Sequence, residues 1–421
     1  KEYCDYPLML YPVELVKNRR CPLFKRRSFF NIYEEFFIVS CGEATAEFYE
    51  YLRNETGYDV NLIWENLLRT CNMADIKDRM QLNHILPKNG VKPGTGGKSR
   101  VALFMHIYFA DQIDWCLRYA ANMPPDADVY VTTNSENTKQ LIEEKFAGLK
   151  CAKLRVSLVE NRGRDVSALL IGCRDVVGDY DYVCFAHDKK TAHVQPLLIG
   201  QSFAYKCFEN ILGSGDFTRN VIRTFEENPR LGLLTPPPPN HSDYYPTFGN
   251  EWGMNFENTV AMARRLDLRV DIDADKMPVA PLGTMFWFRS AALKKIFEYP
   301  WTYEDFPAEP TGQNDGNVLH AIERIYPFVA QDAGYYSGWL LTDAFARLEI
   351  TNLTYMLRDI HKEFLKQYAI RDRKHLVSLI GCPAHEKDMH LAYFWIKGKI
   401  KSVLPSSLWN GLKYFKNKIK K

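Results

Sequence analysis

The sequence predicts an α/β fold, in which a parallel or mixed sheet carries helices on both of its faces. Over residues 99–350, short apolar runs typical of buried strands alternate with segments that have the apolar spacing of helices. Strands that alternate with helices of about ten to fifteen residues indicate right-handed βαβ units. The chain has 421 residues, of which 46% are hydrophobic, so it is long enough to bury such a sheet without disulfide bonds.

The predicted elements follow one another regularly along this central region. The run at 101–108 is apolar throughout, which suits a strand that is buried on both faces. In chain order, the elements are a strand at 101–108, a helix at 112–122, a strand at 128–133, a helix that ends at Phe146, a strand at 154–159, a helix at 166–177, a strand at 182–186, a strand at 231–234 followed by four prolines, a β-prone segment at 283–289 and a helix that contains VLHAIERIY.

Three regions are expected along the chain. Residues 1–98 form a helical N-terminal region that ends in a Gly-rich linker, residues 99–350 form the α/β domain, and residues 351–421 form a helical C-terminal region. The chain starts without Met, and its first residues lack the order of a signal peptide, so we expect a fragment of a longer protein.

Composition excludes several classes of protein. No run of about 20 apolar residues occurs, so no segment is expected to span a membrane. Ten cysteines occur without a CxxC pair or zinc-ligand spacing, which favours free thiols in a reducing compartment. The net charge is +3, yet residues 389–421 hold eight lysines and no acidic residue, so the rest of the chain is net acidic. We therefore expect no nucleic-acid partner.

The basic C-terminal tail predicts a contact with a membrane surface. Leu408, Leu412, Phe415 and Ile419 share one face of a helix, and Trp409 adjoins it. An amphipathic helix with such an excess of lysine binds the interface of an anionic membrane. The alternative is a helix that packs on the body of the protein or on a partner.

Ligands of parallel sheets bind at the carboxyl ends of the strands, so the residues that follow each strand form the candidate site. Thr133 and Asn134 follow the second strand and are suited to contact a nucleobase edge. The alternative is that Asn134 or Ser135 only caps the next helix.

The third strand is followed by Asn161, Arg162, Gly163, Arg164 and Asp165. Gly163 lets the backbone approach a ligand closely, and the two guanidinium groups are suited to bind phosphate. Asp165 is expected to cap the helix at 166–177, whose positive end then faces an anion. The alternative is a solvated charge cluster in which Asp165 is an ordinary cap.

The fourth strand is followed by His187, Asp188, Lys189 and Lys190. One carboxylate with two ammonium groups favours neutralisation of a diphosphate by lysine rather than by a metal ion. We therefore expect that no metal is required, although Mg²⁺ or Mn²⁺ can bind if Asp188 is a ligand and substrate phosphates complete the shell. The alternative is a solvated loop.

Aromatic and polar residues further along the chain are the candidates for binding a sugar or the acceptor. They comprise Trp252, Asn255, Trp287, His320, Glu323 and Arg324. The last three lie at positions i, i+3 and i+4 and share one helical face. The alternatives are core packing for the tryptophans and a structural ion pair for Glu323 and Arg324.

Two carboxylates are candidates for a general base, Glu309 and Asp315. Both lie in the acidic segment before the helix that contains VLHAIERIY, and the sequence does not decide between them. The alternative for Asp315 is the N-cap of that helix.

Four motifs occur in a fixed order: ENRGRDVSALL, DYVCFAHDKKT, GTMFWFRSAALKKIF and EPTGQNDGNVLHAIERI. Over about residues 1–350 the chain thereby resembles the rhamnan synthesis protein F family, and residues 21–30 are similar to a stretch that precedes the second half of longer tandem members. The resemblance implies a GT-A-like, Rossmann-like fold that binds a nucleotide-diphospho-sugar. It implies dTDP-L-rhamnose as the donor and a growing lipid-linked glycan as the acceptor. Members often have His-Thr-Lys-Lys where this chain has His187-Asp-Lys-Lys190.

Motifs and resemblance together predict an inverting glycosyltransferase, most simply a rhamnosyltransferase of cell-wall or surface polysaccharide synthesis. Arg162, Arg164, Lys189 and Lys190 would bind the diphosphate, and one carboxylate would take the proton of the acceptor hydroxyl. The alternative is a catalytically silent half of a larger polysaccharide-assembly protein, which only binds a glycan or a nucleotide sugar. With a lipid-linked acceptor, the expected location is cytoplasmic and peripheral on the inner face of a bacterial plasma membrane.

Overall fold

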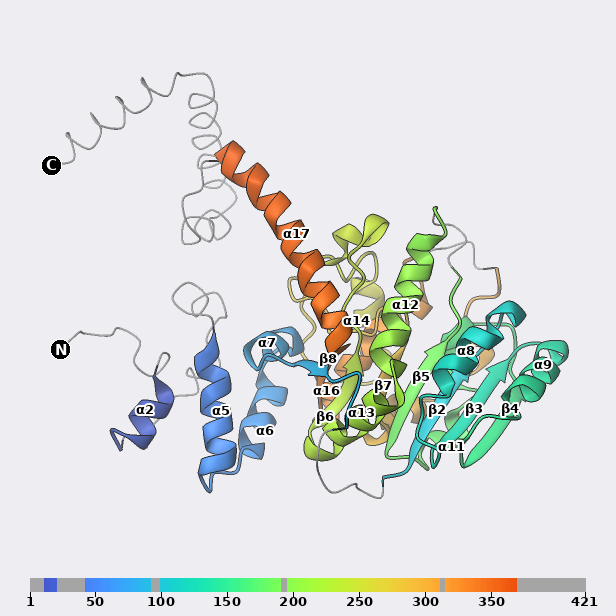
Figure 1. The fold of residues 1–421 in the computed structure, drawn as a ribbon, viewed down its shortest axis with the longest axis horizontal. Helices are drawn as coiled ribbons and strands as arrows, with labels where there is room; N and C mark the ends of the chain where they lie inside the picture. The colour runs from blue at the N-terminus through green and yellow to red at the C-terminus, as the bar shows by residue number, and fades with distance from the viewer. Residues whose placement is uncertain (1–10, 21–41, 92–98, 191–194, 311–314, 369–421) are drawn as a thin grey trace. The chain divides into compact units, whose positions relative to one another are not determined.

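The computed structural model describes residues 11–20, 42–91, 99–190, 195–310 and 315–368 (Figure 1). By its internal contacts the chain divides into two compact units, residues 1–30 with 43–346 and residues 31–42 with 347–421. The first unit contains the sheet and all of the candidate site residues. The second contains most of helix α17 (Asp343–Tyr368). The tail at 389–421, for which a membrane contact is predicted, lies outside the described residues.

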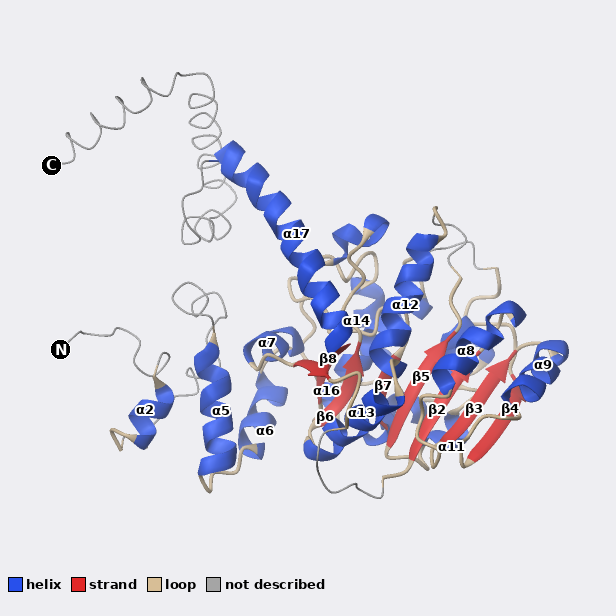
Figure 2. Cartoon of the chain, in the orientation of Figure 1, coloured by secondary structure: helices blue, strands red, loops and turns tan. Residues whose placement is uncertain are grey.

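The first unit is built on an eight-stranded sheet with the order β1-β8-β6-β7-β5-β2-β3-β4 (red in Figure 2). Strand β7 is antiparallel to both of its neighbours, β5 and β6, and the other pairs are parallel. The sheet is therefore mixed, as the sequence predicts. The strands are β1 (Asn83–Leu86), β2 (Val101–His106), β3 (Asp128–Thr133), β4 (Lys153–Leu158), β5 (Tyr182–His187), β6 (Leu231–Thr235), β7 (Phe286–Arg289) and β8 (Tyr336–Thr342).

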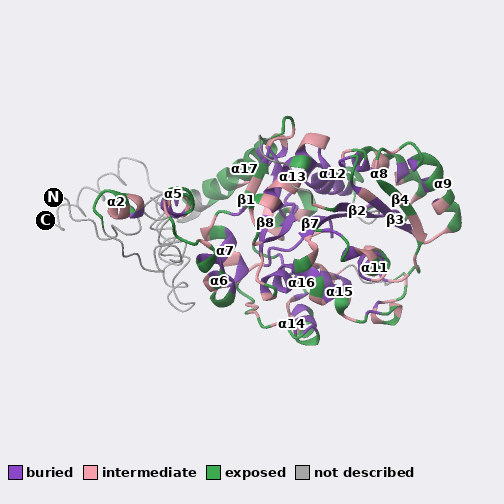
Figure 3. Cartoon of the chain, turned by 90° about the horizontal axis from the view of Figure 1, so that it is seen from below, coloured by how far each residue is buried: buried purple, intermediate pink, exposed green. Residues whose placement is uncertain are grey.

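Helices cover both faces of the sheet, and alternate side chains of its central strands enter two separate cores. In β2, Leu103 and Met105 belong to one buried cluster, whereas Ala102 and Phe104 belong to the other. The first cluster lies under α8 (Ile113–Ala120), α9 (Glu136–Phe146), α12 (Leu198–Leu212) and α13 (Gly215–Glu227). The second lies under α10 (Arg164–Leu170), α11 (Arg174–Val177), α14 (Phe256–Arg265), α15 (Lys294–Glu298) and α16 (Val318–Asp332). Figure 3 shows the strands buried between these two layers.

Short 3₁₀ segments connect several of these elements. They are η1 (Ala110–Gln112), η2 (Ser242–Thr247), η3 (Ser290–Leu293) and η4 (Tyr303–Asp305). No helix among the described residues is long and apolar enough to cross a membrane.

The N-terminal helices belong to the same compact unit as the sheet. These are α2 (Pro12–Lys17), α5 (Glu43–Glu55), α6 (Asn61–Thr70) and α7 (Met73–Arg79). The ring of Trp64 in α6 stacks on that of Tyr336 in β8, with centroids 4.3 Å apart, and β1 pairs with β8 at the edge of the sheet. The boundary expected at residue 98 thus falls inside one compact unit.

The predicted strands at 101–108, 128–133, 154–159, 182–186 and 231–234 are confirmed as β2 to β6 within a few residues. The helix predicted at 166–177 is wrong as a single element, because it breaks between α10 and α11. The sequence analysis did not find β1, which has only four residues, or β8, which contains Ser337 and Gly338.

Candidate active site

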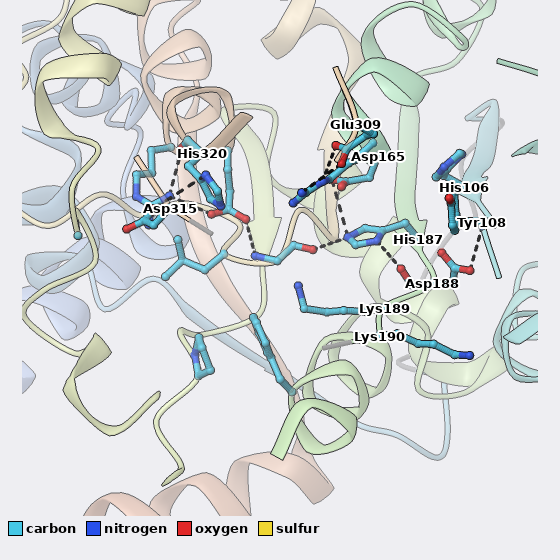
Figure 4. A pocket seen from close by; sticks show the side chains of 18 of the residues that line it. His106, Tyr108, Asp165, His187, Asp188, Lys189, Lys190, Glu309, Asp315 and His320 are labelled. Atoms are coloured by element: carbon cyan, nitrogen blue, oxygen red, sulfur yellow. Dashed lines mark hydrogen bonds and ion pairs between the residues drawn. The ribbon is translucent and has the colours of Figure 1, made fainter. Parts of the chain in front are cut away.

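A cavity of about 830 Å³ opens at the carboxyl ends of β2, β3 and β5 (Figure 4). Its size suits a ligand larger than a single sugar. The residues from the sequence analysis that line it are Asn134, Asn161, Arg162, Arg164, Asp165, His187, Asp188, Lys189, Lys190, Glu309, Asp315, His320, Glu323 and Arg324. Most of the candidate residues therefore lie around one cavity, as expected from the rule that ligands bind at strand ends.

His187 is the last residue of β5, and both of its ring nitrogens face carbonyl oxygens. Nδ1 lies 2.7 Å from the oxygen of Asp188, and Nε2 lies 2.8 Å from the oxygen of Gly283. Carbonyl oxygens only accept, so both bonds form together only when both nitrogens carry protons. The carboxylate of Asp165 lies 3.8 Å from Nε2.

Asp188 ties the end of β5 to the loop after β2. Its Oδ2 accepts hydrogen bonds from the backbone N–H groups of Tyr108 at 2.9 Å and Phe109 at 2.6 Å. Burial raises the pKa of Asp188 to about 6, although these two backbone bonds oppose the shift. Oδ2 of Asp188 thus has a structural role. Asp188 is also the one residue that the sequence offered as a possible metal ligand.

The two lysines after Asp188 have different surroundings. Lys190 forms an ion pair with Asp111 at the rim, and both side chains are exposed. The ammonium group of Lys189 lies 4.6 Å from the ring centroid of Phe203 and forms no salt bridge within 4 Å to the described residues. Figure 4 shows Lys189 between His187 and the opposite wall with Asp315. It therefore keeps its positive charge for an anionic ligand.

Residues 162–164 form a tight turn that packs on the loop before Pro310. Gly163 has a φ of +82°, and a Cβ there would lie 2.7 Å from Cγ of Phe306. Nε of Arg162 donates to the carbonyl of Phe306 at 2.8 Å. Arg164 faces Glu309 with two nitrogens, Nε to Oε1 at 2.7 Å and Nη2 to Oε2 at 3.4 Å. A predicted phosphate ligand and a predicted base are therefore partners of each other.

Asp165 does not cap a helix, so that prediction is wrong. Helix α10 begins at Arg164, and its N-cap is Gly163, which has no side chain. The Asp165 carboxyl lies beside His187, and its Oδ2 is buried without a hydrogen-bond partner among the described residues. Burial opposes its ionisation, but the charges of His187 and Lys189 outweigh this effect and hold the pKa of Asp165 below its usual value.

Asp315 is fixed on the other wall of the cavity. Its Oδ1 accepts from the Asn255 amide at 2.6 Å, its Oδ2 accepts from the Met254 N–H at 3.4 Å, and Nδ1 of His320 lies 3.9 Å away. Burial opposes its charge, but the bond from Asn255 and the N–H of Gly316 hold the pKa of Asp315 below its usual value. The N-cap alternative is excluded, since Asn317 caps α16.

Glu323 and Arg324 form hydrogen bonds with each other and with backbone groups of the protein. Oε2 of Glu323 accepts from the N–H of Gly283 at 2.7 Å, and Oε1 lies 3.0 Å from Nη1 of Arg324. Nε of Arg324 also donates to the carbonyl of Glu251 at 2.8 Å. The structural ion pair is therefore present, and these contacts leave Glu323 little capacity to bind a sugar.

Four other predicted contacts are wrong because the side chains are buried away from the cavity. Trp252 stacks on Phe328 and donates to the carbonyl of Lys276, and Trp287 donates to the carbonyl of Ile211. Asn255 positions Asp315 instead of binding a sugar. Thr133 is fully buried, and Ser135, not Asn134, caps α9.

Four further residues line the cavity but were not predicted from the sequence, namely His106, Tyr108, Glu251 and Gly283. His106 ends β2, pairs in register with His187 and lies 3.0 Å from Oγ1 of Thr132. Burial lowers the pKa of His106 to about 4, so the ring is neutral at pH 7. His106 was not predicted because the expected strand continued to residue 108, two residues beyond the end of β2. With the correct strand end, the rule that ligands bind at strand ends would have selected it.

The described residues around the cavity include no built site for a divalent metal. Among the described residues, no group of three or more His, Cys, Asp or Glu side chains is placed to hold an ion. Hard cations such as Mg²⁺ prefer several carboxylate oxygens, whereas two lysines follow the single carboxylate of Asp188.

The fold and cavity define an α/β protein with lysine and arginine side chains around a cavity at the carboxyl ends of its strands. The chain belongs to the rhamnan synthesis protein F family, whose family model matches residues 2–335. No curated protein matches the chain.

Two solved structures are similar over much of their length. A crystal structure of S. aureus TarS, residues 1–349, has 12% identity and a TM-score of 0.30, and the match covers 70% of each chain. Core-mannan synthase A from Aspergillus fumigatus, in an Mn/GDP form, has 10% identity and a TM-score of 0.27, with 61% of this chain and 78% of that chain covered. The chain is assigned to the α/β class from the strand order of its own sheet and the helices that cover it.

The close packing at Gly163 predicts a difference between two glycines of similar backbone conformation. Gly249 has a φ of +80° and nothing within 4 Å of an added Cβ, so Gly249→Ala should cost only about 1–2 kcal/mol of left-handed strain. Gly163→Ala should cost about 1–3 kcal/mol more, because Phe306 must move. Urea denaturation measures both, and equal free energies of unfolding would contradict the turn described here.

Proposed function

We propose that this chain is a glycosyltransferase of polysaccharide synthesis, which transfers L-rhamnose from dTDP-L-rhamnose to a lipid-linked glycan with inversion. Membership in the rhamnan synthesis protein F family supports the type of product. The observation that carries the proposal is one cavity with two charged groups on opposite sides. One is the ammonium group of Lys189, which has no salt bridge within 4 Å to the described residues, and the other is the fixed carboxylate of Asp315.

The cations at the ends of β4 and β5 support binding of the donor diphosphate. When the bond between the anomeric carbon and the diphosphate oxygen breaks, negative charge develops on the leaving group. Lys189 is the cation best placed to neutralise it, since Arg164 and Lys190 already face Glu309 and Asp111. Arg162 lines the same cavity and adds a second positive charge.

Asp315 is the better of the two candidate bases. Its carboxylate is ionised, and Asn255 and Met254 fix its orientation, whereas Glu309 faces the guanidinium of Arg164 with both oxygens. In the proposed step Asp315 takes the proton of the acceptor hydroxyl as that oxygen bonds to the anomeric carbon. The opposite face of that carbon loses the diphosphate, so its configuration inverts.

The acceptor and the location belong to the same proposal. The predicted amphipathic tail at 389–421 would hold the protein on the cytoplasmic face of a bacterial plasma membrane, close to a lipid-linked acceptor. This part rests on the sequence alone.

Replacement of the base should separate chemistry from binding. Asp315→Asn should lower the hydrolysis or transfer of dTDP-L-rhamnose by roughly 10²–10⁴-fold, because proton transfer is lost. The dissociation constant of the donor, measured by calorimetry, should change by less than about twofold, since Asp315 lies away from the cations.

Glu309→Gln is the matched variant and should retain most of the turnover. If Asp315→Asn keeps near-normal turnover, or Glu309→Gln is the variant that loses it, the assignment of the base is wrong. A wild-type chain that binds the donor but never consumes it would favour the silent binding half instead.

Removal of divalent metal should leave donor hydrolysis largely intact. The reason is that two lysines, rather than two carboxylates, follow β5. Turnover of dTDP-L-rhamnose in EDTA should stay within about twofold of that in Mg²⁺ or Mn²⁺, because ammonium groups supply the neutralising charge. Complete loss in chelator, restored by either ion, would make Asp188 a metal ligand and overturn this expectation.

A further inference from the structure

The backbone of Gly283 connects the two walls of the cavity. Its N–H donates to Oε2 of Glu323 on α16 at 2.7 Å, and its carbonyl lies 2.8 Å from Nε2 of His187 at the end of β5. The N–H of Gly283 thus binds one wall of the cavity, and its carbonyl binds the other. These two groups belong to successive peptide planes, so Glu323 acts on the His187 ring through the backbone conformation of the turn at Gly283.

The turn at Gly283 and Thr284 needs external support. Gly283 has a φ of +94°, and a Cβ there would lie 3.0 Å from Cζ of Phe203. Thr284 has a φ of +52°, which is unusual for a β-branched residue. Such conformations persist only where the surroundings fix them. Glu323 supplies this support, because its Oε2 also lies 3.3 Å from Oγ1 of Thr284.

Glu323 is itself held in place. Its side chain is 12% exposed, and Nη1 of Arg324 lies 3.0 Å from Oε1. Arg324 is anchored in turn through Glu251 and the carbonyl of His320. A carboxylate that is fixed on both oxygens forms strong, directional hydrogen bonds.

The donor-binding segment after β5 depends on the orientation of the His187 ring, which contacts the carbonyl of Gly283. His187 precedes Asp188 and Lys189 directly, and its Nδ1 contacts the carbonyl of Asp188. The ring of Phe203 packs next to Gly283, where it would contact an added Cβ, and the ammonium group of Lys189 lies over the same ring. Loss of the Gly283 turn therefore disturbs the segment that carries Lys189.

We propose that Glu323 is a positioning residue that, through the backbone turn at Gly283 and Thr284, fixes His187 and with it the donor-binding segment on the opposite wall. This inference rests on the proposed function for the identity of the ligand, but not for the link between Glu323 and His187. It replaces the sugar-binding role that the sequence suggested for Glu323.

The link is tested first without any ligand. In protein labelled with ¹⁵N in its ten histidine rings, His187→Gln identifies the ring signals of His187. Glu323→Ala should shift or broaden those signals. Glu323→Gln should restore them in part, because its amide oxygen can still accept from Gly283. Glu298→Gln, at an exposed position on α15, should leave them unchanged.

Binding of dTDP-L-rhamnose is tested second, by calorimetry on the same variants. Glu323→Ala should weaken binding roughly tenfold or more, comparable to the loss of one charge-assisted hydrogen bond, with Glu323→Gln in between. A melting temperature close to that of Glu323→Gln shows that the protein is still folded.

The outcomes separate this inference from the proposed function. If Glu323→Ala leaves both the His187 signals and the donor affinity unchanged, the positioning role is wrong. If the His187 signals move but the wild-type chain binds no dTDP-L-rhamnose, the link stands and the proposed donor is wrong.

Discussion

The hydrogen bonds at the end of β5 are the constraint on which the site depends. His187 and Asp188 are 8% and 5% exposed, and a buried polar group without a partner costs about 1–3 kcal/mol. Asp188 meets this need through the backbone after β2, and His187 meets it through the carbonyl of Gly283 before β7. Three segments that are distant in the sequence are thereby joined at one point, and the cavity opens beside it.

The charges around the cavity differ in how far the protein already neutralises them. Arg164 and Lys190 have carboxylate partners, and such pairs contribute little at exposed positions. Lys189 has an aromatic ring as its neighbour and keeps its charge for a ligand. Among the described residues, a cation without a carboxylate partner attracts an anion more strongly than Arg164 and Lys190, whose charges are already balanced by carboxylates.

The sequence predicted the strands and the edge of the sheet where the site lies, because these follow from local apolar runs and from the geometry of βαβ units. It could not predict what each side chain contacts across the fold. Trp287 and Glu323 look like ligands for a sugar in the sequence, but one is a core residue and the other supports a strained turn. Gly172 lies between α10 and α11, and a Cβ there would lie 2.6 Å from the carbonyl oxygen of Ala168 and 2.8 Å from Cγ1 of Val159.

Calorimetric titration of dTDP-L-rhamnose in EDTA tests the central claim most directly, namely that this cavity binds a diphosphate through the chain's own cations. The wild-type chain should bind, and Lys189→Met, which keeps the apolar stem, should bind roughly tenfold or more weakly. Lys294→Met, at an exposed position on α15, should bind like the wild type. No binding by the wild-type chain, or equal affinity for Lys189→Met and wild type, would contradict the account.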